Sequence, residues 1–174
     1  MDDYMFTKSK FNLCVGWERY LDNTRTTIFL QKTGRHIRNL IFKPMNNLFS
    51  LYQFLKTALM LYHYEKGTLG NVTSIRLYFA VKKIGVLEDE KTFGTGGQML
   101  EKFQEFLGIM ENLQTLDLRN FLLEVEDAPF LDQVCGVCCE TLQTLHLINL
   151  TRKPKTLLYP GIFVNLRTLY ISPQ

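Results

Sequence analysis

The sequence is poor in cysteine and proline, and this excludes several classes of protein. Its 174 residues include four cysteines, five prolines and one tryptophan. A secreted disulfide scaffold is smaller and far richer in cysteine, so we expect a reducing compartment, the cytoplasm or the nucleus. The prolines are scattered and 46% of the residues are hydrophobic. This composition excludes a collagen-like or wholly disordered chain.

Long apolar runs and a strong net charge are also missing. No strictly apolar run is longer than that at residues 58–62, which is far short of the roughly 18 residues that a membrane span needs. No early segment has the features of a secretory signal, so we expect neither a membrane partner nor export. The formal net charge is +3, and the basic residues form small separated groups. They match no nucleic-acid-binding signature, so we expect no nucleic-acid partner.

An internal repeat is the most informative feature that the sequence does have. The pattern L-x-x-L-x-L occurs three times almost unchanged and twice with other apolar residues in the leucine slots. The copies cover residues 37–42, 72–77, 113–118, 142–147 and 166–171, with connections of unequal length. Alternation of apolar and other residues is typical of a strand. The repeat therefore predicts five strands near these ranges.

A further apolar slot lies three residues upstream of each copy, and only Gly34 departs from it; the others are Leu69, Met110, Cys139 and Phe163. After each of the first three strands, the apolar residues change to helical spacing. These stripes run over residues 48–62, 99–110 and 131–138. They predict three helices whose apolar sides belong to the core.

One strand-helix unit cannot bury its own apolar face, so neighbouring units must stack. We therefore predict an α/β fold of the leucine-rich-repeat solenoid type, a short curved parallel sheet with helices on the convex side. The repeat domain covers residues 24–174, and residues 1–23 form a separate N-terminal segment. In this fold Cys135, Cys138 and Cys139 are small buried hydrophobic residues.

The frame C-x-x-L-x-x-L-x-L with variable connections resembles the leucine-rich repeats of F-box proteins. Residues 29–40, followed by 42–46, are similar to the first repeat after the F-box, and Cys14-Val-Gly-Trp17 is similar to a Cys-x-x-Trp near an F-box end. The resemblance covers about residues 17–174 and identifies residues 1–23 as a possible F-box remnant. It implies the substrate-binding part of an adaptor in a cullin-RING (SCF) ubiquitin ligase, which is not an enzyme.

In that family the F-box binds Skp1, so the resemblance implies Skp1 and cullin as partners only where the parent protein carries an F-box. The Leu-Pro opening of an F-box is not found in residues 1–16, and the chain ends on the fifth pattern. We therefore expect a fragment or a partial gene model. The alternative is a leucine-rich-repeat scaffold for protein-protein interaction that is unrelated to ubiquitin.

Alternation along each strand also predicts the side chains on the open, concave side of the sheet. One column is short and polar, namely Asn39, Ser74, Thr115, Thr144 and Thr168. The second column is Ile41, Arg76, Asp117, His146 and Tyr170, and the third is Lys43, Tyr78, Arg119, Ile148 and Ser172. Together they mix arginine and tyrosine with aliphatic residues, and such residue types are common at binding hot spots. The predicted partner-binding residues are Ile41, Lys43, Arg76, Tyr78, Asp117, Arg119, His146, Ile148 and Tyr170. The alternative is an ordinary solvent-facing sheet in which Asp117 only pairs with Arg76 or Arg119.

No motif predicts catalysis, a cofactor or a metal. The glycine-rich stretch at residues 94–97 lacks the Gly-Lys-Ser/Thr ending of a phosphate-binding loop. The cysteines at 135–139 have no second Cys/His pair at zinc-finger spacing. The three histidines have no recognisable catalytic spacing from a cysteine. We therefore expect no catalytic residue, no cofactor and no metal site.

Overall fold

The computed structural model describes residues 4–6, 12–15, 23–45, 48–65, 67–79, 98–119, 136–148 and 160–172. Its elements, in chain order, are β1 (Tyr4–Phe6), β2 (Asn12–Val15), α1 (Asn23–Thr33), η1 (Gly34–His36), β3 (Asn39–Met45), α2 (Leu48–Tyr64), β4 (Ser74–Phe79), α3 (Gln98–Gly108), β5 (Thr115–Arg119), β6 (Thr144–Ile148), η4 (Pro160–Ile162) and β7 (Thr168–Ser172).

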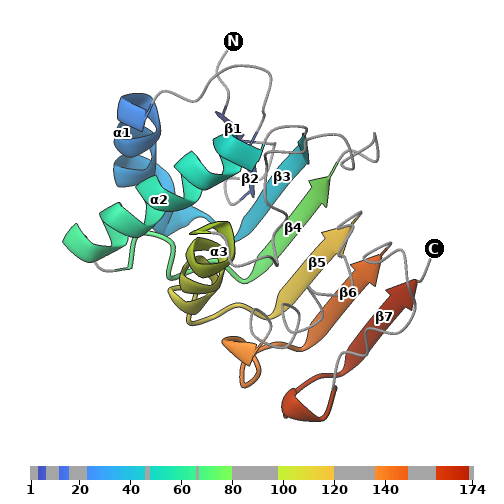
Figure 1. Cartoon of the computed structure of the whole chain (residues 1–174). Coiled ribbons are helices and arrows are strands. Elements are labelled where there is room, and N and C mark those ends of the chain that lie inside the picture. The colour runs from blue at the N-terminus through green and yellow to red at the C-terminus, as the bar shows by residue number, and fades with distance from the viewer. Residues whose placement is uncertain are drawn as a thin grey trace.

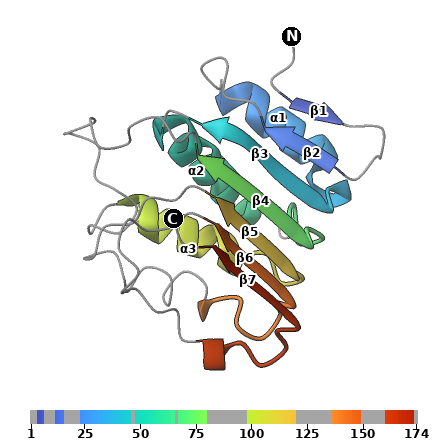
Figure 2. The same ribbon diagram turned by 90° about the vertical axis from the view of Figure 1, so that its right-hand side faces the viewer.

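The strands form one seven-stranded sheet in which they lie in chain order, β1 to β7. β1 is antiparallel to β2, and every later strand is parallel to the one before it. Parallel neighbours need a crossover connection; α2 lies in the connection from β3 to β4, and α3 in that from β4 to β5. Figures 1 and 2 show α1, α2 and α3 on the same face of the sheet. The predicted α/β class, with a repeat-like alternation of parallel strands and helices, is confirmed.

All five predicted strands are present, and each begins two residues later than its pattern; the pattern at 113–118, for example, becomes β5 at Thr115–Arg119. The first slot is a buried residue just before the strand in the first four patterns, as for Leu113 and Leu142, and is half-buried in the fifth, at Leu166. The sequence analysis assigned no element to residues before 37. There the structure adds α1, β1 and β2, and the two strands join the sheet of the repeats.

The two leucine slots inside each strand form the core between the sheet and the helices. In β3 to β6 these side chains are buried, namely Leu40, Phe42, Ile75, Leu77, Leu116, Leu118, Leu145 and Leu147. The ring of Phe42 contacts that of Phe54 in α2 at 5.4 Å between centroids, and Phe54 contacts Phe106 in α3 at 6.3 Å. These edge-to-face contacts connect the sheet to both helices.

The helices predicted at 48–62 and 99–110 are present as α2 and α3, and most of their described apolar side chains lie in the core. Of the third predicted stripe, residues 131–135 lie outside the described residues, and Cys138 is buried. In β7 the slots differ, because Leu169 and Ile171 are 39% and 53% exposed. Burial of the repeat slots is therefore complete from β3 to β6 and partial at β7.

The turn after α2 depends on a glycine. Gly67 has a φ of 93°, a left-handed conformation that glycine adopts without steric cost. The N–H of Gly70 then donates to the carbonyl of Gly67 at 3.1 Å, and that of Val72 donates to the carbonyl of Leu69 at 3.2 Å. The turn directs the chain back along the sheet into β4.

The strand starts repeat one another at the level of single hydrogen bonds. The carbonyl of Arg38 accepts bonds from the N–H groups of Thr73 and Ser74, at 2.8 and 3.2 Å. In the same way, the carbonyls of residues 73, 114 and 143 accept bonds from residues 114/115, 143/144 and 167/168. Because one carbonyl serves two N–H groups at each step, successive units keep the same register.

Asparagine side chains connect successive units beside three of these strand starts. Nδ2 of Asn71 donates to the carbonyl of residue 35 at 2.9 Å, Nδ2 of Asn112 to that of residue 70 at 2.7 Å, and Nδ2 of Asn165 to that of residue 140 at 2.6 Å. Each asparagine directly precedes the first slot of its pattern. At the equivalent position before β6, Thr141 Oγ1 donates to Cys138 within its own turn, at 3.4 Å. The sequence analysis missed this asparagine ladder, although its spacing is visible in the sequence.

Gly34 is the one departure from the upstream apolar slot, and the structure gives the reason. A Cβ at residue 34 would lie 2.6 Å from both Cγ2 and the backbone oxygen of Thr68. The turn of the next unit thus occupies the space that a side chain at this slot would need. Of the residues at the equivalent slot, Leu69, Met110 and Phe163 are buried and Cys139 is half-buried.

Within the described ranges, no helix has both the length and the apolar composition that a membrane crossing requires.

Candidate interaction surface

The face of the sheet opposite the helices carries the predicted columns of side chains. Backbone pairing aligns the first column, Asn39, Ser74, Thr115, Thr144 and Thr168, and the second, Ile41, Arg76, Asp117, His146 and Tyr170. The third column aligns Tyr78, Arg119, Ile148 and Ser172. Parallel strands in one frame place equivalent residues side by side. Side chains far apart in the sequence therefore share one surface, which we call the open face.

Lys43 does not align with the third column as the sequence analysis predicted. Four pairs hold one register up to Phe42 with Leu77, after which Met45 pairs with Phe79. Between these two pairs, β3 therefore has two residues, 43 and 44, where β4 has only residue 78. Pro44 lies in this stretch and has no N–H for the ladder, which suits proline to such irregularities. The regular third column therefore begins at Tyr78.

Asp117 of β5 lies at the centre of the open face and is only 2% exposed. Nε and Nη2 of Arg119 donate to its two carboxylate oxygens, each at 2.9 Å. A buried carboxylate is very unfavourable unless it is paired and hydrogen-bonded. A bidentate guanidinium is the strongest such partner among side chains. Arg119 therefore supplies the pairing that allows Asp117 to be buried.

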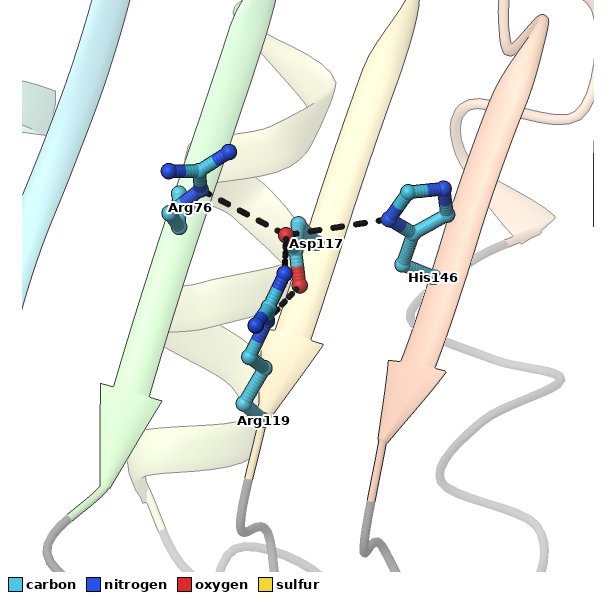
Figure 3. A network of polar contacts seen from close by, with 4 residues as sticks. All are labelled: Arg76, Asp117, Arg119 and His146. Atoms are coloured by element: carbon cyan, nitrogen blue, oxygen red, sulfur yellow. Dashed lines mark hydrogen bonds and ion pairs between the residues drawn. The ribbon is translucent and has the colours of Figure 1, made fainter. Parts of the chain in front are cut away.

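Two neighbouring strands complete the surroundings of this carboxylate, as Figure 3 shows. Nε of Arg76 on β4 lies 3.4 Å from Oδ2, and Nδ1 of His146 on β6 lies 3.8 Å from the same oxygen. The hydrogen bond to Asp117 is the largest effect on Arg119, and it raises the pKa of that guanidinium. Arg119 therefore keeps its positive charge at physiological pH.

Two tyrosines flank the charged residues. The guanidinium carbon of Arg119 lies 4.9 Å from the ring centre of Tyr78, and that of Arg76 lies 5.8 Å from it. The ring of Tyr170 meets that of His146 edge to face, with 5.9 Å between centroids. Cation-π and edge-to-face contacts of this kind hold side chains in a defined orientation. We call Arg76, Tyr78, Asp117, Arg119, His146 and Tyr170 the Asp117 cluster.

The remaining predicted residues border this cluster. Ile41 pairs with Arg76 in the sheet, and Ile148 pairs with Arg119. Both isoleucines are half-buried, so they offer apolar contact beside the charged groups. Tyr170 is the most exposed aromatic side chain of the cluster at 53%, and the side chain of Arg76 is 48% exposed. The cluster thus combines a buried anion with accessible cationic and aromatic groups.

Cys138 and Cys139 lie in the turn before β6, outside the columns of the open face. Cys138 and Cys139 are free thiols, the first buried and the second half-buried. Burial, with a smaller effect of Cys139, raises the pKa of Cys138 to about 12, so its thiolate does not form near neutral pH. Cys135 lies outside the described residues. In the described part of the chain, no group of three His, Cys, Asp or Glu side chains is placed to hold a metal ion.

A polar hollow of about 260 Å³ lies near the N-terminal ends of β5, β6 and β7, and Asn112, Gln143, Asn165 and Arg167 are among its lining residues. Small-molecule sites are usually larger and mostly apolar. Both lining asparagines, Asn112 and Asn165, already donate to the ladder between units. The open face is therefore the better candidate for a functional surface.

The fold class follows from the equivalence of the chain's own units, which share strand register, hydrogen bonds and core slots. No protein-family model matches the chain, and neither a curated protein nor a solved structure matches it.

Proposed function

We propose that this chain is a non-catalytic protein-recognition module that binds a protein partner on the open face of its sheet. The observation that carries this proposal is the Asp117 cluster, in which accessible arginine and tyrosine side chains surround a buried carboxylate. Arginine and tyrosine are over-represented among the residues that dominate the energy of protein interfaces. The cluster has the composition of such a hot spot.

The geometry of the cluster supports binding in a second way. Arg119 is held by two hydrogen bonds to Asp117 and lies against the ring of Tyr78. Side chains that are already ordered lose less conformational entropy when a partner binds. The sheet beneath them is fixed by the paired strands on both sides of β5. A preorganised surface of this kind favours affinity.

The shape of the surface favours a macromolecular partner. The open face is formed by aligned columns across β3 to β7, whereas sites for small molecules are pockets that enclose most of the ligand. The first column adds threonine and serine hydroxyl groups beside the cluster. These groups can hydrogen-bond to the backbone or side chains of a bound segment.

We further propose that the protein partner is a substrate for ubiquitination, held by this chain as the substrate-binding part of an F-box adaptor in a cullin-RING ligase. The support is the resemblance of the repeat frame to the leucine-rich repeats of F-box proteins. In that role the chain does no chemistry itself. Skp1 and cullin join the complex only where the parent protein carries an F-box.

A scaffold that is unrelated to ubiquitin is the second candidate function. The observation that favours it is the position of β1 and β2, which extend the sheet of the repeats into residues 4–15. The resemblance led us to expect a remnant of the helical F-box in this part of the chain. A sheet that continues there is the simpler arrangement for a scaffold.

Site-specific photo-crosslinking tests the open face directly. A photoreactive phenylalanine analogue replaces Thr168, which is exposed on the open face, or Met60, which is exposed on α2. We expect covalent adducts with a partner protein from residue 168 and far fewer from residue 60. Adducts that form only from residue 60, or from neither residue, would contradict binding on the open face.

The same samples separate the two candidate functions. Immunoblots of the native complex for Skp1 and cullin should be positive if the chain belongs to a ubiquitin ligase adaptor. A partner crosslinked through residue 168 without Skp1 or cullin would remove the ubiquitin proposal and leave the scaffold. Both outcomes apply only to a complex whose partner has been crosslinked through residue 168 and therefore contacts the open face.

A further inference from the structure

The charge of the Asp117 cluster is not balanced. Arg76 and Arg119 each carry a positive charge, and among the described residues Asp117 is the one carboxylate that pairs with them. With His146 counted as neutral, the cluster keeps one net positive charge. The aligned residues of the first column are all uncharged. The middle of the open face therefore has an excess of positive charge.

The two arginines differ in how many of their guanidinium nitrogens contact Asp117. Arg119 donates through Nε and Nη2 to Asp117 at 2.9 Å, whereas Arg76 approaches the same carboxylate only through Nε, at 3.4 Å. Among the described residues, the two terminal nitrogens of Arg76 have no hydrogen-bond acceptor. This guanidinium is also about half exposed. Arg76 can thus form a bidentate pair with an anion from outside.

We propose that the open face binds an acidic segment of a protein partner, with an aspartate or glutamate carboxylate of that segment paired to Arg76. The proposal deepens the proposed recognition function and depends on it. The charge of the surface is complementary to such a segment, and the rings of Tyr78 and Tyr170 offer apolar contact to the residues beside the carboxylate. Asp117 orients Arg119 and neutralises one of the two arginine charges, so the surface keeps one net positive charge.

A protein segment fits these observations better than a nucleic acid. Nucleic-acid surfaces contact several phosphates and carry a correspondingly large cluster of lysine and arginine. Here one of the two arginines is already paired to Asp117. Half-exposed isoleucines and an exposed tyrosine beside one available guanidinium suit a peptide with both acidic and apolar residues.

The test is selection from a random-peptide phage library on the folded chain, followed by affinity measurement with the synthetic peptides. We expect the selected peptides to carry net negative charge, and replacement of their glutamates by glutamine to weaken binding. Arg76→Gln should raise the Kd about tenfold or more, because it removes a charge-assisted bidentate pair. Arg25→Gln removes the same charge from the exposed surface of α1, and it should leave the Kd within about twofold, as expected of a surface charge outside the open face.

Three other outcomes would overturn the inference. Neutral or basic peptides that are weakened by Tyr170→Ala but not by Arg76→Gln would leave the open face as the binding surface and remove the acidic partner. Peptides that are insensitive to both substitutions would remove the proposed function as well. Tighter binding of a single-stranded oligonucleotide with the same net charge as the peptide would identify a nucleic acid instead. Thermal melting of each variant verifies that it is folded.

Discussion

Asp117 and Arg119 form a bidentate ion pair within one strand, with both nitrogen-oxygen distances at 2.9 Å. Residues two apart on a strand point to the same face, so the pair closes on β5 without help from other strands. The contacts from β4 and β6 are longer, at 3.4 Å from Arg76 and 3.8 Å from His146. The pair neutralises the buried carboxylate and leaves Arg76 as the less engaged cation.

Asp117→Asn should lower the free energy of unfolding by about 1.5–3 kcal/mol, the usual contribution of hydrogen bonds to a charged group. Urea denaturation measures this change. Arg76→Gln is the matched control, and it should lower the free energy by less than about 1 kcal/mol because it removes one exposed contact. Equal losses for the two variants would show that Arg119 is not the main partner of Asp117.

Leu145→Ala should lower the free energy of unfolding by about 2–5 kcal/mol, since it opens a cavity in the fully buried core beneath β6. Leu169→Ala changes the same slot of the next unit, where the side chain is 39% exposed. Its loss should be well under half as large, because the area removed from water is smaller. Denaturant titration of both variants gives the ratio, and similar losses would contradict the difference in burial between β6 and β7.

Gly34→Ala should destabilise the protein by about 1–3 kcal/mol, because the added methyl group would overlap Thr68, including its backbone oxygen. Gly108→Ala is the matched control, as nothing lies within 4 Å of the Cβ it would add at the end of α3. That change should be neutral or stabilising by up to about 1 kcal/mol. A melting temperature for Gly34→Ala equal to that of the parent chain would refute the steric account of this slot.

Thr141→Asn should extend the asparagine ladder by one step. The new amide would reach the carbonyl of residue 111, the equivalent of the acceptors at residues 35, 70 and 140. We expect a gain of about 0.5–1.5 kcal/mol in the free energy of unfolding, the net value of one hydrogen bond. Asn112→Ala should lose a similar amount. Destabilisation by Thr141→Asn, measured by chemical denaturation, would mean that an asparagine before β6 does not form the hydrogen bond seen in the other units.

Stability should fall at alkaline pH through Cys138. Burial raises the pKa of this thiol to about 12 in the folded state, whereas the pKa of a thiol in an unfolded chain is about 8.5. The folded state therefore holds the proton more tightly, and its stabilisation is complete below the unfolded pKa and is lost as the pH rises toward 12. Urea denaturation over this range should show a shallower decline for Cys138→Ala than for the parent chain.

Native alkylation provides the companion measurement on the same thiol. Cys139 is half-buried and Cys138 is buried, so iodoacetamide should label Cys139 first at neutral pH. Peptide mass spectrometry reads the order of labelling. Equal rates, or an identical alkaline decline with and without Cys138, would contradict the burial of this thiol.

The strands and the columns of the open face could be predicted because they depend on local alternation. Leu116, Leu145 and Leu169 occupy the same slot of their patterns, and parallel pairing in one frame aligns them across the sheet. The second column was predicted completely for this reason. The third failed at Lys43, because the irregularity beside Pro44 shifts the register of β3.

Other features could not be read from the pattern. α1, β1 and β2 have no copy of the repeat, so the periodicity that identified the later elements says nothing about them. Pairing of Asp117 with one of the arginines was foreseen only as an alternative to partner binding. The structure shows that Asp117 pairs with both arginines, and that within the described ranges the terminal nitrogens of Arg76 have no acceptor.

The sequence by itself determined the repeating unit, the five repeat strands and, apart from Lys43, the residues that share a column, because these follow from spacing between near neighbours in the chain. Only the tertiary structure decided that Asp117 is buried, that Gly34 must lack a side chain and that the slots of β7 remain accessible. Burial and charge pairing depend on atoms from separate units. Their positions are set by how the units stack, so a pattern within one unit does not contain them.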